Sequence, residues 1–127
     1  MFDLAADERK LLAIQRRDRR YAPEAYEFTR LAVTYASEVV FATGTHVNGR
    51  ELLEAIRQFG LERYGLLTRE VLESWGVRAT EDFGEIVFNL VSIGKMRKTP
   101  GDRREDFDDV YDFAAAFQRE FKITPPE

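Results

Sequence analysis

A run of carboxylates near the end of the chain has the clearest potential for chemistry. Residues 105–112 read EDFDDVYD and contain the spacing D-D-x-x-D, which on a helix gathers oxygen ligands for Mg²⁺. The alternation of apolar and polar residues here predicts a strand instead. On a strand Asp109 faces away from Asp108 and Asp112, so the three carboxylates do not converge. The sequence therefore favours no metal site, with a weak hard-cation site as the alternative.

Other residue types that carry catalysis are scarce. His46 is the only histidine, so one chain cannot form a multi-histidine metal site, and a structural role in its Gly/Thr loop is the simpler interpretation. Ser37, Ser74 and Ser92 lack the flanking glycines of a hydrolase nucleophile. The Gly-Lys pair in SIGKMRKT lacks the spaced glycines of a phosphate-binding loop. We therefore expect a protein that is not an enzyme and binds no cofactor.

Two groups of cations are candidates for binding a phosphate backbone. The first lies in RRDRR and the second follows Gly94; together they are Arg16, Arg17, Arg19, Arg20, Lys95, Arg97, Lys98, Arg103 and Arg104. The simpler interpretation is a solvated helix end for the first group, and pairing with nearby aspartates for the second. Residues 21–94 carry six basic and eleven acidic side chains, which is a poor platform for a polyanion. Nucleic-acid binding through these cations is therefore the alternative function.

Length and composition indicate one globular domain. The chain has 127 residues, of which 44% are hydrophobic and 33% charged, and its net charge is −4. Cysteine is absent, and no apolar run approaches the roughly 20 residues that cross a bilayer. The first ten residues lack the pattern of a signal peptide. We expect a cytoplasmic protein with no membrane partner, folded over residues 1–122 with a flexible tail at 123–127.

Apolar spacing predicts helices over residues 4–17, 23–42, 48–65, 66–75 and 80–93. The helix over 23–42 is apolar around much of its circumference and should be central. Asn48 and Glu51 form a capping-box pattern, and Gly65 is a suitable glycine to end that helix. Thr80 is the expected N-cap of the helix that Gly94 ends.

Beyond Gly94 the apolar period changes from 3.6 to 2. KMRKT and DFDDVYDF flank PGDRRE, which predicts a β-hairpin that places Phe107, Asp109, Tyr111 and Phe113 on one side. A last helix over 114–121 would dock Phe117 and Phe121. Helix, turn, helix and hairpin in this order is the winged-helix arrangement. The predicted fold is mainly α with a small β-hairpin, a winged-helix-like single domain with extra N- and C-terminal helices.

The helix over 80–93 occupies the recognition-helix position of that arrangement. The residues expected to face inward are Phe83, Ile86, Val87 and Leu90, and those expected to face outward are Glu81, Glu85, Phe88, Asn89 and Ser92. Helices that read DNA present amides and cations, whereas this face offers one amide, two carboxylates and no cation. Sequence-specific DNA binding is therefore not expected. An aromatic ring bordered by acids indicates a protein interface, unless Phe88 packs under a terminal segment.

Four segments together resemble a family of small bacterial conserved hypothetical proteins. They are YAPEAYEFTRLAV, HVNGRELLEAIRQFGLERYG, TEDFGEIVFNLV and DFDDVYDF, and the resemblance spans residues 4–121. It implies a bacterial source and a free-standing domain, and it brings no activity or site residue with it. The resulting hypothesis is an adaptor or regulatory module that binds a protein partner through the outward face of residues 81–92. The sequence determines neither the partner nor the oligomeric state.

Overall fold

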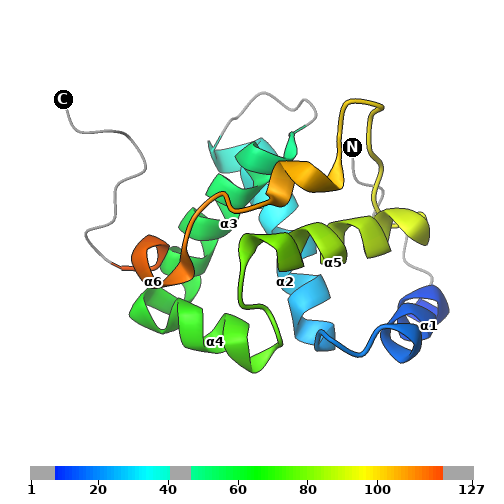
Figure 1. Ribbon diagram of the computed structural model, residues 1–127, viewed down its shortest axis with the longest axis horizontal. Coiled ribbons are helices and arrows are strands. Elements are labelled where there is room, and N and C mark those ends of the chain that lie inside the picture. The colour runs from blue at the N-terminus through cyan, green and yellow to red at the C-terminus, as the bar shows by residue number, and fades with distance from the viewer. Residues whose placement is uncertain (1–7, 41–46, 119–127) are drawn as a thin grey trace.

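The computed structural model describes residues 8–40 and 47–118 (Figure 1). The helical elements are α1 (Glu8–Arg17), α2 (Pro23–Tyr35) with a π-helical extension η1 (Ala36–Val40), α3 (Gly49–Tyr64), the 3₁₀ turn η2 (Gly65–Leu67), α4 (Thr68–Ser74), α5 (Thr80–Ser92), the 3₁₀ turn η3 (Arg104–Phe107) and α6 (Phe113–Ala116). These ranges contain helices and turns but no strand. None of the described helices is both long and apolar enough to cross a membrane.

Helix α2 packs against both α3 and α5, as its wide apolar face predicts. Pro23 stands in the first turn, where its missing N–H has no helical partner to lose. The buried residues cover more than one face; they are Ala25, Tyr26, Phe28, Thr29, Ala32 and Val33. The core of the described chain therefore forms around this helix.

Helix α3 begins and ends where local sequence signals predict. Asn48 Oδ1 accepts from the Glu51 N–H at 2.8 Å, and Glu51 Oε1 accepts from the Asn48 N–H at 3.0 Å, which confirms the capping box. Gly65 follows the helix with φ of 59°, a conformation that favours glycine. Thr68 Oγ1 donates to the Gly60 carbonyl at 2.8 Å and thereby ties the start of α4 to α3.

Helix α5 buries Phe83, Ile86, Val87 and Leu90, so the predicted inward face is confirmed. Its N-terminus differs from the prediction. Asp82 Oδ2 accepts from the backbone N–H groups of Arg78 at 2.8 Å and Ala79 at 3.1 Å. Thr80 is fully buried, and its Oγ1 accepts instead from the Val110 N–H at 3.1 Å. Thr80 therefore bonds to the distant loop at Val110 instead of capping α5, and Asp82 caps the N-terminus of α5.

The predicted hairpin, and with it the winged helix, is wrong. Residues 95–112 form turns and a short 3₁₀ helix, because their aspartates bond to nearby backbone N–H groups. Asp102 Oδ2 accepts from Thr99 N at 2.9 Å, Asp106 Oδ2 from Arg103 N at 3.0 Å, and Asp112 Oδ2 from Ala115 N at 3.2 Å. These local bonds compete with a strand ladder, from which aspartate is in any case depleted.

Phe107 takes the place that a wing would occupy. Turn η3 lies across α3 and α5, where Phe107 is buried (Figure 1). A Cβ on Gly49 or on Gly84 would lie only 3.0 Å from a Phe107 carbon, so both helices need glycine at this contact. Asp109, predicted to share a side with Phe107, is exposed and has φ of 47°. The aromatic residues of this segment are core residues, but on a turn rather than a strand.

Helix α6 closes the described chain beside α3. Phe113 and Phe117 are both buried, with ring centroids 5.2 Å apart, so the docking of Phe117 is confirmed. The helix predicted over 114–121 is shorter in the structure, where α6 ends at Ala116. Phe121 and the predicted tail at 123–127 lie outside the described residues. His46 and the expected helix start at residue 4 also lie outside them.

Candidate protein-binding surface

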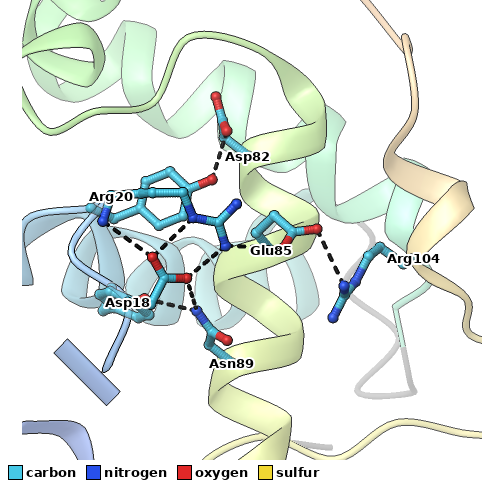
Figure 2. A network of polar contacts seen from close by, with 8 residues as sticks. Asp18, Arg20, Asp82, Glu85, Asn89 and Arg104 are labelled. Atoms are coloured by element: carbon cyan, nitrogen blue, oxygen red, sulfur yellow. Dashed lines mark hydrogen bonds and ion pairs between the residues drawn. The ribbon is translucent and has the colours of Figure 1, made fainter. Parts of the chain in front are cut away.

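The outward face of α5 carries a polar network rather than a bare patch (Figure 2). Glu85 Oε1 lies 3.1 Å from an Arg20 nitrogen, and Glu85 Oε2 lies 3.4 Å from an Arg104 nitrogen. Asn89 Nδ2 donates to Asp18 Oδ2 and to the Tyr26 hydroxyl, both at 3.0 Å. Two of the predicted interface residues thus hold the segment between α1 and α2 against α5.

Asp18 is the centre of this network. The Arg20 guanidinium donates to Asp18 Oδ1 at 2.9 Å and to Oδ2 at 2.6 Å, and the Arg20 backbone N–H adds a third bond. These bonds hold the pKa of the Asp18 carboxyl far below its usual range, against an opposing effect of burial. Nearby, the Tyr21 hydroxyl donates to Asp82 at 2.6 Å, and burial together with this carboxylate raises the pKa of Tyr21.

Phe88 is half-buried and packs against the edge of the core. The guanidinium of Arg104 lies 5.1 Å from the centre of its ring, a cation–π distance. Glu81 and Ser92 are exposed, and the Ser92 hydroxyl donates to the Asn89 carbonyl at 2.7 Å. Of the predicted interface residues, Glu85, Phe88 and Asn89 therefore contact other parts of the chain, whereas Glu81 and Ser92 face solvent.

One cation from each of the two predicted groups reaches the same face of α5. Arg20 and Arg104 reach Glu85 from different elements (Figure 2), while Arg16, Arg17, Arg19, Arg97, Lys98 and Arg103 are exposed. Lys95 is only 1% exposed, and its Nζ has no hydrogen-bond partner among the described residues. Lys95 is therefore inaccessible to a phosphate backbone in this structure.

The carboxylates of residues 105–112 do not gather. Asp106 and Asp112 cap short helices, while Asp108 and Asp109 are exposed. The described part of the chain contains no cluster of three or more His, Asp or Glu side chains arranged to hold a metal.

A surface groove lies between α2, the end of α3 and the end of α4. It has a volume of about 150 Å³ and is lined by Glu24, Glu27, Phe28, Leu31, Arg63, Tyr64 and Trp75. Three aromatic rings form its apolar wall. The Phe28 ring centroid lies 5.7 Å from Trp75 and 6.1 Å from Tyr64, and the Tyr64 and Trp75 centroids are 6.0 Å apart.

Charged side chains surround this aromatic wall. Glu24 stands in the first turn of α2, and Glu27 lies 3.5 Å from Arg30 with 59% of its side chain exposed. The Arg63 guanidinium lies 5.6 Å from the Phe59 ring centre and 6.0 Å from that of Tyr64. The groove can therefore offer aromatic surface and carboxylate oxygens to the same ligand.

Sequence reasoning missed this groove because its residues come from three elements that no local pattern connects. Trp75 follows the short helix α4 and is partly buried against the core. Its backbone carbonyl accepts from the Ala22 N–H at 3.0 Å, which joins the end of α4 to the start of α2. Leu31 on α2 lines the groove and is 38% exposed, which the sequence pattern does not reveal.

No protein-family model, curated protein or solved structure matches this chain, so its function is inferred from its own residues.

Proposed function

We propose that the protein is a non-catalytic interaction module that binds a segment of a partner protein in the groove between α2, α3 and α4. The observation that supports this most directly is the groove itself, a cavity of about 150 Å³ walled by Phe28, Tyr64 and Trp75. Aromatic side chains are enriched among residues that dominate binding energy at protein interfaces. The groove thus has the composition of a pocket for one anchoring side chain.

Exposed leucines occur in the groove and in the turn that follows α3. Leu31 lines the groove, and Leu66 and Leu67, which follow Tyr64 by two and three residues, are 55% and 63% exposed. Single exposed leucines are ordinary, but an exposed pair in one short turn offers apolar surface that a partner can cover. A partner segment with one anchor in the groove and apolar neighbours over η2 would use both features.

The outward face of α5 is a weaker candidate than the groove. Glu85 and Asn89 already have charged or polar partners within the chain, and Arg104 covers Phe88. A ligand on this face would have to replace those contacts, and its own contacts would be offset by the ones it broke. Phe88 lines a pocket of only about 30 Å³, whereas the groove has a volume of about 150 Å³.

Nucleic-acid binding is the second candidate function. It is favoured by the approach of Arg20 and Arg104 to the same α5 carboxylate, which brings the two groups of cations to one face. Asp18, Glu81 and Glu85 on that face oppose a polyanion. This candidate predicts affinity for duplex DNA that falls steeply as salt rises.

A capture experiment with matched variants tests the proposal. Tagged protein is incubated with lysate of the source organism, with and without nuclease, as wild type, Leu31→Lys and Leu12→Lys. Leu12 is the control because it is a 50% exposed leucine on α1, which does not line the groove. We expect one nuclease-resistant protein to be retained by wild type and Leu12→Lys and lost from Leu31→Lys. Equal retention by Leu31→Lys would contradict the groove, and loss on nuclease treatment would favour the second candidate.

A further inference from the structure

We infer that the groove between α2, α3 and α4 accepts a cationic side chain, arginine or lysine, from a basic segment of the partner protein. This inference rests on the proposed function and adds the chemistry of its ligand. It follows from the rings that wall the groove, from the charges on its rim and from a similar contact elsewhere in the molecule.

The aromatic residues that line the groove suit a cation. The negative faces of aromatic rings attract ammonium and guanidinium groups, and tryptophan attracts them most strongly. Trp75 and Tyr64 are both partly exposed and stand nearly perpendicular, with an interplanar angle of 79°. Cavities of about 150 Å³ can hold one benzene-sized group, which is the scale of a single side-chain head.

The rim supplies the opposite charge. Glu24 and Glu27 line the groove against one cation, Arg63, whose guanidinium already lies over Phe59 and Tyr64. Glu27 has a long contact to Arg30 at 3.5 Å, whereas no ion pair of Glu24 is found among the described residues. A bound cation therefore gains a charge-assisted contact at Glu24 without displacing an existing ion pair.

The fold already forms this combination of groups between α5 and η3. Arg104 lies 5.1 Å from the Phe88 ring centre and 3.4 Å from Glu85, so one guanidinium contacts an aromatic face and a carboxylate together. The groove presents the same two acceptor types, with Trp75 in place of Phe88 and Glu24 in place of Glu85. In the groove, the cation would come from the partner.

The charge of the chain favours a basic partner. The net charge is −4, and residues 21–94, which supply every side chain of the groove, carry eleven acidic and six basic groups. Such a field raises the rate at which a basic segment meets the surface, and it weakens with salt. An acidic partner segment would be repelled.

Trp75 is the only tryptophan, so its fluorescence reports on the groove without a label. The probes are three peptides of the form acetyl-Gly-Leu-X-Leu-Gly-amide, in which X is arginine, citrulline or leucine. Citrulline has the shape of arginine without its charge. The proteins are wild type, the double variant Glu24→Gln with Glu27→Gln, and the control Glu81→Gln, an exposed carboxylate on α5.

We expect the arginine peptide to bind wild type and Glu81→Gln about 10-fold more tightly than the citrulline peptide, and the double variant to lose most of that difference. If all three peptides bind wild type equally, or the double variant keeps the arginine preference, the cation inference is overturned while the interaction function stands. If none of them changes Trp75 fluorescence at millimolar concentration, the groove is not a binding site and both proposals fail.

Discussion

Two surfaces of this molecule are built from the same kinds of residue but differ in what fills them. The outward face of α5 has an aromatic ring, Phe88, beside a carboxylate, Glu85, and the chain's own Arg104 contacts both. The groove between α2, α3 and α4 has Trp75 and Tyr64 beside Glu24 and Glu27, around about 150 Å³ of open volume. On the first surface a single arginine of the chain contacts the ring and the carboxylate together, whereas in the groove Arg63 approaches Tyr64 and no ion pair joins Glu24 to another described residue.

The difference shows why surface composition alone misplaces an interface. Phe88 among acidic neighbours indicates an exposed anchor as long as the chain beyond Gly94 is taken for a hairpin that extends away. Because that segment folds back as η3, its arginine covers the ring. The sequence pattern does not reveal the groove, because its aromatic rings become neighbours only when α2, α3 and α4 pack together.

The largest effect on stability is expected where Gly76, next to Trp75 of the groove, packs against the backbone of Arg20. Gly76 has φ of 92°, and a Cβ there would clash with the carbonyl oxygen of Arg20. We expect Gly76→Ala to lower the free energy of unfolding by about 3 kcal/mol or more, because both the strained φ and the clash must be relieved. Urea denaturation measures this, and a loss below about 1 kcal/mol would show that this contact is not rigid.

The second largest effect on the free energy of unfolding is expected at Phe88. Because its ring packs against the core edge under Arg104, Phe88→Ala should lower the free energy of unfolding by about 2 kcal/mol. The matched control is Leu12→Ala, at a 50% exposed leucine, with an expected change within about 0.5 kcal/mol. Equal stability of the two variants would mean that Phe88 is free for a partner.

The polar network predicts a pH dependence of stability. The pKa of Asp18 is lowered in the folded protein, so its contribution is complete above the unfolded value of about 4 and is lost as pH falls below it. The free energy of unfolding of wild type should therefore exceed that of Asp18→Asn by about 1–2 kcal/mol at pH 7. This difference should shrink below a pH of about 4. Denaturation curves across pH 2–7 measure it. A difference that stays constant with pH would indicate that Asp18 acts through packing alone.

The smallest effect on stability is expected in the groove. Leu31→Lys replaces a 38% exposed side chain and should change the free energy of unfolding by about 0.5 kcal/mol or less. The same variant should lose measurable binding of the arginine peptide, because its ammonium group repels the arginine and apolar contact surface at the groove is lost. Urea denaturation and Trp75 titration together measure the two effects, and a large loss of stability would show that Leu31 belongs to the core.

Local signals made part of the fold predictable. The capping box at Asn48, the end of α3 at Gly65 and the buried face of α5 depend on residues within a few positions of one another. The alternation in residues 106–113 failed as a guide because Asp106 and Asp112 bond to backbone N–H groups only three residues away. The alternation still identified Phe107 and Phe113 as core residues, because these apolar side chains are buried in the turn as they would be in a strand.

The candidate site was less predictable than the fold. Helical periodicity placed Phe88 outward, but no pattern indicated that Arg104, sixteen positions later, would lie over it. Nor does any spacing relate Glu24 to Trp75, which meet through the Ala22 to Trp75 backbone bond and the packing of α2 on α3. Such contacts arise from tertiary packing, which overrides local preference.

The most direct test of the central contrast is a map of peptide-induced chemical-shift changes by ¹H–¹⁵N NMR. Titration of the arginine peptide into ¹⁵N-labelled wild type should shift the amides of Leu31, Tyr64 and Trp75 and leave those of Phe88 and Asn89 in place. Shifts centred on Phe88 and Asn89 would contradict the account, because they would show that the α5 face, and not the groove, is the surface open to a partner.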